Sequence, residues 1–242
     1  MTSTEKQKIA NFLDLTNDFT GSGYKSQKRE YNFSDDLTSL NNTAEDKNTE
    51  INTIDSLEKI NEEIRICNRC PLFNSRTNAA PGEGSEEPLV MIIGEGPGED
   101  EDKQGRPFTG KAGQLLDKML SSINLSRTTN TFITNIVKCR PLNNRDPLPD
   151  ETAICAHFLE RQILLIKPKI ILVLGKVAAH ALLKTIEPIG NMRGKFTELS
   201  VKGKTFPLLV TYHPAALLRN EDFKRPAWED LKLLKSKLPM GD

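Results

Sequence analysis

The sequence predicts an α/β fold in which a parallel β-sheet is covered by helices on both faces. Four short, mostly apolar runs have the composition of strands, and they lie at 89–93, 131–139, 169–175 and 206–214. The runs are largely continuous rather than alternating, as expected for strands that are buried on both faces of a sheet. Helical patterns separate the runs, and strands that alternate with helices indicate a parallel sheet.

The helices are predicted from apolar residues that recur every three or four positions. They are expected at 56–67, 111–123, 151–166, 176–186 and 225–238. The first leads directly into Cys67. Asp150 is expected to cap the helix that follows it, and Pro168 marks the far end of that helix. Residues 190–203 are expected to be an excursion from the regular alternation.

Residues 1–52 are predicted to be a disordered polar extension, and residues 53–242 to be the folded domain. The extension is rich in Asn, Thr, Ser, Asp and Lys and shows no sustained periodicity. Such a segment cannot bury enough apolar surface to offset the entropy that is lost when it orders.

Composition excludes several classes of protein. The chain has 33 basic and 33 acidic residues, so a general basic coat for nucleic acid is absent and a local basic face would have to bind it. No apolar run approaches the roughly 20 residues of a membrane span. The N-terminus lacks the pattern of a secretory signal, so we expect a cytoplasmic protein, in which four cysteines favour a metal or cluster site over disulfides.

Three loops are predicted to meet at one edge of the sheet. The segments 94–110, 135–145 and 213–219 each begin where a predicted strand ends. In open parallel sheets the ligand lies at the carboxyl ends of the strands. The three loops are therefore expected to form one cleft.

The four cysteines of the chain have the spacing of a metal site. Cys67 and Cys70 form a C-x₂-C pair, and Cys139 and Cys155 follow in the predicted domain. Four thiolates suit either structural zinc or a [4Fe–4S] cluster, and spacing does not separate the two. The alternative is that the pair is coincidental and that Cys155 is a small buried apolar residue.

A glycine-rich loop and one histidine are further candidates for function. The loop Gly94-Glu-Gly-Pro-Gly98 follows a strand directly, where its N–H groups can approach a ligand. It matches neither a P-loop nor a dinucleotide fingerprint. His213 lies at the exit of a strand and precedes a proline, which favours a ligand-facing position. His157 and His180 lie within predicted helices and are expected to be structural.

Four features taken together resemble the family-4 uracil-DNA glycosylases, the iron–sulfur branch of their superfamily. They are GEGPGEDEDKQGRPFTGKAGQLL, ITNIVKCRPLNNR, the four-cysteine spacing, and HPAALLR followed by KRPAWEDL. The resemblance runs in order from Cys67 to Leu238. It implies a three-layer αβα domain around a four-stranded parallel sheet. It also implies that Cys67, Cys70, Cys139 and Cys155 ligate a structural [4Fe–4S] cluster, so iron is preferred to zinc.

The resemblance also implies a function in base excision repair, in which uracil is flipped out of DNA and its N-glycosidic bond is hydrolysed to leave an abasic site. Phe108 matches the aromatic residue on which uracil stacks. Asn135 matches the amide that pairs with uracil O4 and N3–H and so rejects cytosine. Glu101 matches a position that could exclude thymine by its bulk near C5.

Two further residues match positions that act on the bond itself. His213 matches the histidine that donates a hydrogen bond to uracil O2 as negative charge develops there. The best-known branch of the superfamily has an aspartate where Gly96 stands here, at the border of the substrate. Glu95 is therefore the candidate for holding the attacking water, and the alternative is a scaffold role for Glu95 in its loop.

Contacts with DNA are expected after the histidine motif. Leu217 matches the apolar wedge that fills the space left by the flipped nucleotide. Arg219, Lys224 and Arg225 are candidates for binding phosphates. The alternatives are an ordinary loop leucine and solvated surface charges.

The expected partner is uracil-containing DNA, single- or double-stranded, and we expect a monomer that does not bind membranes. The extension at 1–52 is a candidate contact for a repair or replication partner. Three alternatives remain open: a glycosylase of the same fold for hypoxanthine or xanthine, a relative that captures uracil covalently, and a non-catalytic cluster-bearing scaffold. The sequence lacks the basic, histidine-containing insertion expected of the covalent type.

Overall fold

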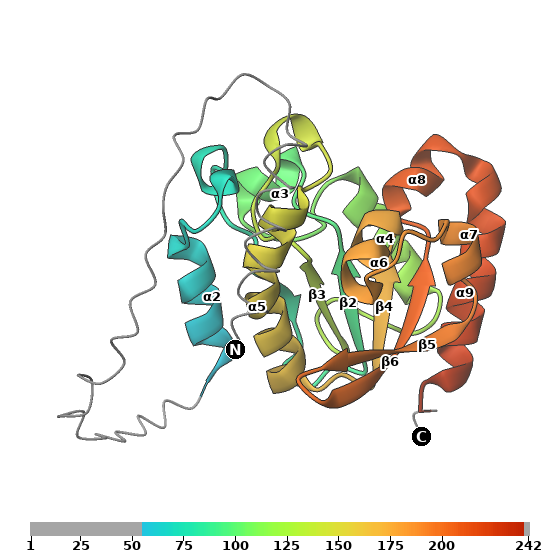
Figure 1. The fold of residues 1–242 in the computed structure, drawn as a ribbon. Coiled ribbons are helices and arrows are strands. Elements are labelled where there is room, and N and C mark those ends of the chain that lie inside the picture. The colour runs from blue at the N-terminus through green and yellow to red at the C-terminus, as the bar shows by residue number, and fades with distance from the viewer. Residues whose placement is uncertain (1–54, 240–242) are drawn as a thin grey trace, which may run out of the picture. The chain divides into compact units, whose positions relative to one another are not determined.

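A six-stranded mixed sheet forms the centre of residues 55–239, the part of the chain that the computed structural model describes (Figure 1). The strand order is β1-β3-β2-β4-β6-β5. The strands are β1 (Glu83–Gly84), β2 (Val90–Gly94), β3 (Thr131–Asn135), β4 (Ile170–Leu174), β5 (Phe196–Val201) and β6 (Lys204–Thr211). The extension predicted at 1–52 lies outside the described residues, so its disorder stays a prediction.

The four central strands are parallel, as predicted. β2 pairs with β3 and β4, and β4 pairs with β6, all in parallel register. The two edge strands are antiparallel, since β1 runs against β3 and β5 runs against β6. The sheet therefore has the predicted four-stranded parallel core, with one antiparallel strand added at each edge.

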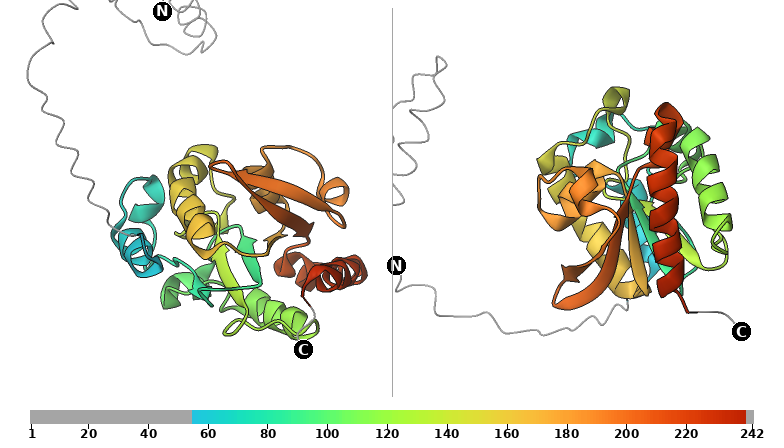
Figure 2. Two further views of the ribbon diagram at one scale, coloured as in Figure 1. Left: turned by 90° about the horizontal axis from the view of Figure 1, so that it is seen from below. Right: turned by 90° about the vertical axis from the view of Figure 1, so that its right-hand side faces the viewer.

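Helices cover both faces of the sheet (Figure 2). The α-helices are α2 (Leu57–Ile66), α3 (Glu99–Gln104), α4 (Lys111–Ser121), α5 (Pro149–Ile166), α6 (Lys176–Leu183), α7 (Ile189–Met192), α8 (Pro214–Arg219) and α9 (Lys224–Lys237). Short 3-10 turns lie at η1 (Pro71–Asn74), η2 (Leu142–Asn144) and η3 (Glu221–Phe223).

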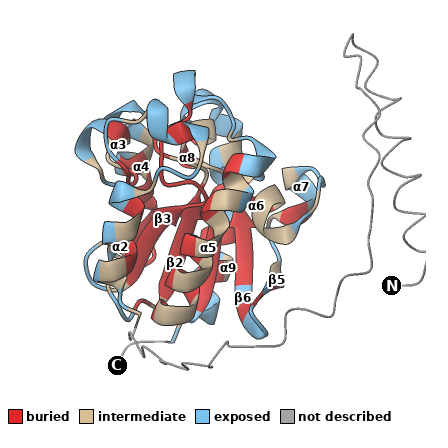
Figure 3. Ribbon diagram, turned by 60° about the vertical axis from the view of Figure 1, so that its left-hand side comes forward, coloured by how far each residue is buried: buried red, intermediate tan, exposed pale blue. Residues whose placement is uncertain are grey.

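Alternate residues of β2 show how the two layers of core are built. Val90 and Ile92 pack with apolar side chains of α4, α8 and α9 on one face. Met91 and Ile93 pack with side chains of α5, α6 and α7 on the other. The central strands are consequently buried on both faces (Figure 3), which is the physical reason for their continuous apolar sequences.

A third, smaller core surrounds the cysteines. It joins α2, through Ile60 and Ile64, to Phe158 of α5, and it includes Cys139 and Cys155. The helix that was predicted to lead into Cys67 therefore packs on α5 rather than on the sheet, and it closes one side of the cysteine site.

Three details differ from the sequence predictions. The N-cap of α5 is Leu148, and Asp150 lies in the first turn, where its negative charge still favours the helix N-terminus. The helix α3 forms inside the segment expected to be a loop. The excursion at 190–203 contains the end of α7 and the edge strand β5.

Within residues 55–239, none of the helices has the length and apolar character needed to span a membrane.

Candidate active site

An open cleft of about 620 Å³ lies at the carboxyl ends of the parallel strands. Its walls come from the segments that follow β2, β3 and β6, so the predicted convergence of these loops is confirmed. The turn after β4 completes the wall with Gly175, Lys176 and Val177.

The glycine-rich loop starts at a point where no side chain fits. A Cβ atom on Gly94 would lie 2.5 Å from Oδ1 of Asn135 and 2.5 Å from the ring of Phe108. A Cβ on Gly96 would lie 2.8 Å from Cγ2 of Val137. The glycines thus allow the loop to lie directly against the end of β3 and against the aromatic ring.

Asn135 is the last residue of β3 and is only 1% exposed. Neither its side-chain oxygen nor its side-chain nitrogen has a hydrogen-bond partner among residues 55–239. Buried amides are almost always hydrogen-bonded, because an unpaired polar group loses its contacts with water and gains none. The Asn135 amide is therefore poised for a ligand that both donates and accepts.

Phe108 places an aromatic ring beside this amide. The residue is buried, and its ring stacks near that of His213, with 5.5 Å between ring centroids and 29° between planes. Phe108 and His213 both line the cleft. An amide, an aromatic face and an imidazole from three different segments are thus brought together, as the sequence predicted.

His213 is held as a neutral hydrogen-bond donor. The backbone N–H of Ala215 donates to Nδ1 at 3.1 Å, so the proton of the neutral ring is assigned to Nε2. Burial, and then the positive charge of Arg219, lower the pKa of His213 to about 4. The imidazole is consequently uncharged at neutral pH, with an N–H available to a ligand.

Glu95 lines the same cleft, one residue after β2. Burial, and next the nearby charge of Asp146, raise its pKa to about 7, against the opposing effect of Arg219 and Lys176. Near neutral pH this carboxyl can therefore both accept and release a proton.

Glu101 also borders the cleft, but its carboxylate is occupied by backbone groups. The N–H groups of Thr109 and Gly110 donate to Oε1 at 2.9 Å each, and the N–H of Gly98 donates to Oε2 at 3.0 Å. Through these hydrogen bonds, Glu101 holds together the loop before α3 and the loop after it. Exclusion of thymine by Glu101 stays a prediction.

The structure buries the predicted wedge, Leu217, so its role on DNA stays a prediction. Leu217 is 2% exposed and packs in the core with α4 and α9, whereas a wedge has to reach out of the protein. Leu218, the next residue of α8, is 51% exposed. Motif spacing could not separate the two, since neighbouring residues of a helix face about 100° apart.

The three predicted basic residues lie close together in sequence and are all exposed. Arg219 also lines the cleft. Lys224 pairs with Glu221 at 2.5 Å, and Arg225 follows it in the first turn of α9. Of the three, Arg219 follows the exposed Leu218 directly in the chain.

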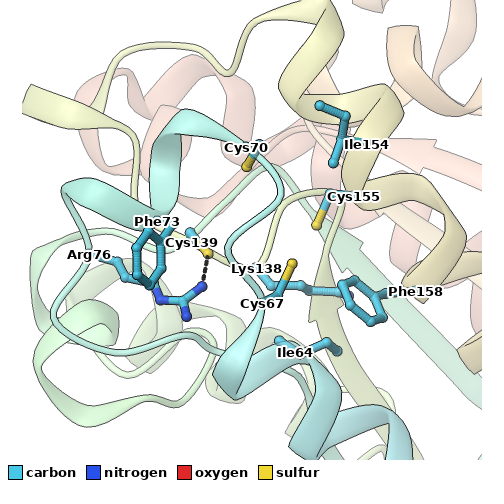
Figure 4. Close-up of a pocket in the computed structure, with 10 residues that line it drawn as sticks. All are labelled: Ile64, Cys67, Cys70, Phe73, Arg76, Lys138, Cys139, Ile154, Cys155 and Phe158. Atoms are coloured by element: carbon cyan, nitrogen blue, oxygen red, sulfur yellow. Dashed lines mark hydrogen bonds between the residues drawn. The ribbon is translucent and has the colours of Figure 1, made fainter.

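All four cysteines line one small cavity of about 20 Å³ between α2, η1 and α5 (Figure 4). Nη1 of Arg76 donates to Sγ of Cys139 at 2.9 Å. Burial raises the pKa of Cys155 to about 11. Within residues 55–239, no three candidate ligands lie close enough together to hold a single metal ion. The thiols are gathered, but they do not form a ready single-ion site.

Sequence reasoning missed several charged residues of the cleft. Arg145, Asp146 and Lys176 line it, and Asp146 acts on Glu95. Their only sequence signal is their position in turns that follow β3 and β4.

The chain is similar to characterised glycosylases over most of its length. Residues 81–232 match the model of the uracil DNA glycosylase superfamily. A type-4 uracil-DNA glycosylase of Sulfurisphaera tokodaii is 45% identical over 186 residues, which cover 75% of this chain and 84% of the relative. A type-4 enzyme of Saccharolobus solfataricus is 45% identical over 190 residues, covering 76% and 88%. One of Thermotoga maritima is 41% identical over 184 residues, covering 74% and 93%. The chain therefore belongs to the uracil-DNA glycosylase superfamily, with the type-4 enzymes among its relatives.

Proposed function

We propose that the protein removes uracil from DNA by hydrolysing the bond between the base and its sugar. The observation that carries this proposal is the buried amide of Asn135, which has no partner among residues 55–239 and lies beside Phe108, a residue that lines the cleft. The similarity to type-4 uracil-DNA glycosylases supports the same reaction.

The amide suits uracil because uracil presents an acceptor next to a donor. The NH₂ group of Asn135 donates to O4, and its carbonyl accepts from N3–H, while the base stacks on Phe108. Cytosine presents a donor and an acceptor in the reverse order, so both contacts become unfavourable. Mispaired buried polar groups are costly, which gives the site its selectivity.

Cleavage of the N-glycosidic bond requires that the charges developing on the base and on the sugar are both stabilised. As the bond between C1′ and N1 breaks, its electron pair moves onto the uracil ring, and His213 donates from Nε2 to the developing charge on O2. A neutral donor held in a buried site stabilises such charge without reorganising.

Glu95 acts on the other side of the bond. Its carboxylate orients a water molecule toward C1′ and lies near the positive charge that forms on the sugar. The water oxygen forms the new bond to C1′, its proton passes to Glu95 or to solvent, and the uracil anion is protonated on release.

We propose that the four cysteines hold a [4Fe–4S] cluster, and the similarity to the type-4 enzymes supports this proposal. Their thiols converge on one cavity without single-ion geometry, and Arg76 donates toward Cys139. Such a cluster, held by Cys67, Cys70, Cys139 and Cys155, supplies a structural crosslink between α2, α5 and the segment after β3. Hydrolysis needs no electron transfer from it.

Duplex DNA has to release the base before the cleft can reach it, at a cost of a few kcal/mol. We assign the wedge to Leu218, because it is exposed beside Arg219. Arg219, Lys224 and Arg225 then bind flanking phosphates.

Base release from end-labelled oligonucleotides tests the proposal. Four substrates differ only in carrying uracil, hypoxanthine, xanthine or thymine, and abasic sites are read as strand cleavage after alkali. Cleavage confined to uracil is expected. Preferential cleavage at hypoxanthine or xanthine would reassign the substrate, and no cleavage by cluster-loaded protein would favour a scaffold role.

A further inference from the structure

The backbone that carries Phe108 is held by a residue outside the cleft. Arg127 lies between α4 and β3, and its Nη1 donates to the carbonyl of Pro107 at 2.8 Å. Its Nη2 donates to the carbonyl of Phe108 at 2.7 Å. One guanidinium thus binds two consecutive carbonyls of the loop through two separate nitrogens, whose fixed spacing in a planar fork a lysine ammonium does not offer.

The same loop is bound from the other side by Glu101, through the N–H groups of Thr109 and Gly110. Four successive residues, 107–110, are therefore tied down by two opposite charges. The Arg127 cation donates hydrogen bonds to backbone carbonyls, and the Glu101 anion accepts hydrogen bonds from backbone N–H groups.

The hydrogen bonds of Arg127 and Glu101 hold the loop in a backbone conformation that it would otherwise avoid. Phe108 has a φ of +54°, in the left-handed region that bulky residues rarely adopt. Its carbonyl also lies so close to α4 that a Cβ on Gly113 would be 1.8 Å away. The Phe108 backbone therefore needs both the glycine of α4 and the donors of Arg127.

Arg127 is itself anchored. Its Nη1 donates to Glu83 of β1 at 2.5 Å, and its Nε donates to Asp117 of α4 at 3.0 Å. Its side chain is 15% exposed. The guanidinium is thus fixed from two secondary-structure elements before it reaches the loop.

We infer that Arg127 is a positioning residue for uracil recognition, which sets the plane and depth of the Phe108 ring without touching the base. This inference rests on the proposed stacking role of Phe108. Because Arg127 holds the ring in place before uracil arrives, the stacking contact forms without a cost for ordering the loop.

Inhibition by free uracil measures this effect, because the base alone probes the pocket and not the DNA surface. Arg127→Met is expected to weaken inhibition roughly tenfold, the scale of releasing one strained backbone residue. Affinity for DNA that already carries an abasic site is expected to change less than about twofold, since that ligand has no base to stack. A loss of folding would lower both the inhibition by uracil and the affinity for abasic DNA.

Arg106→Met is the matched control. Arg106 bonds to the same Glu83 carboxylate, but it donates to neither loop carbonyl, and its side chain is 57% exposed. Inhibition by uracil is expected to stay at the wild-type value in this variant. If Arg127→Met does not fold, Arg127→Lys replaces it, since lysine keeps the charge toward Glu83 and loses the paired donors.

A double-mutant cycle with Phe108→Ala separates the inference from the proposal beneath it. If Arg127 acts through the ring, Arg127→Met adds no further loss of uracil inhibition in the Phe108→Ala background. Either of two results would overturn the role of Arg127 and leave that of Phe108 intact. In the first, Arg127→Met causes an equal loss of uracil inhibition in both backgrounds. In the second, Arg127→Met keeps wild-type inhibition while Phe108→Ala shows a clear loss. Wild-type inhibition in Phe108→Ala would overturn the stacking role itself.

Discussion

The cleft and the cysteine site are joined by one short stretch of chain, yet they are built in opposite ways. Asn135, the last residue of β3 and a neighbour of the cleft, and Cys139 of the cysteine site lie four residues apart. The cleft is open, with a volume of about 620 Å³, and its amide, ring and imidazole already converge. The cysteine cavity measures about 20 Å³ and lacks single-ion geometry within residues 55–239.

The difference follows from what holds each site. Close backbone packing at Gly94 and the hydrogen bonds that backbone N–H groups donate to Glu101 fix the cleft, and none of these depends on a ligand. The cysteines are held by apolar packing, and burial raises the pKa values of Cys139 and Cys155, which favours the protonated form of these two thiols. Binding of the proposed cluster would have to displace those protons, so the structure of the cysteine site would be coupled to the cluster, and that of the cleft would not.

The largest expected effect falls on the preformed cleft. His213→Ala is expected to slow single-turnover uracil excision by roughly 10²–10³-fold, the scale of losing one oxyanion donor. His180→Ala is the control, because His180 of α6 bonds to the backbone carbonyl of Glu187 and does not line the cleft. Near-normal excision by the His213 variant would remove this residue from the mechanism.

The next effect falls on the cysteine site. Cys155→Ala is expected to abolish stoichiometric iron and visible cluster absorption, and to lower the Tm by about 5–10 °C as the ligand-linked stability is lost. Asn68→Ala, an exposed change between Cys67 and Cys70, is expected to keep iron and Tm unchanged. Stoichiometric zinc without iron in the wild-type protein would contradict the cluster.

A smaller effect is expected in the pH profile. Glu95 has a pKa raised to about 7 and orients water as a carboxylate, so excision should fall as the pH drops through 7. His213, with a pKa of about 4, stays neutral over this range. Glu95→Gln should remove this acidic limb, the fall in excision below pH 7.

Asp146→Asn is a second test of the same limb. The change removes a negative neighbour of Glu95, lowers the pKa of Glu95 and should shift the limb to lower pH. If the limb does not move, it belongs to another group.

Much of the fold could be predicted because burial on both faces leaves a plain trace in the sequence. β2, β3 and β4 are buried along their whole length, and β2 and β4 appear as continuous apolar runs. β5 has a mixed burial pattern, β1 has only two residues, and α3 consists of charged residues without apolar spacing. The edges of the sheet were therefore missed.

The site shows the same division. Asn135 and His213 could be predicted because each follows a strand within a recognisable motif. The role of Arg127 could not be predicted, since its partners are backbone carbonyls 19 and 20 residues away. Every residue type carries a backbone carbonyl, so the sequence gives no sign of this contact. The exposure of Leu218 and the burial of Leu217 could not be predicted, because helix rotation, and not motif spacing, decides which leucine faces outward.

The most direct test of the account is single-turnover excision from matched uracil- and cytosine-containing oligonucleotides by the wild-type protein and Asn135→Asp. The carboxylate faces uracil O4 with an acceptor, so uracil excision should fall by about a hundredfold. It can accept from the amino group of cytosine, so cytosine release should become detectable. An unchanged preference for uracil over cytosine in Asn135→Asp would contradict recognition by the amide.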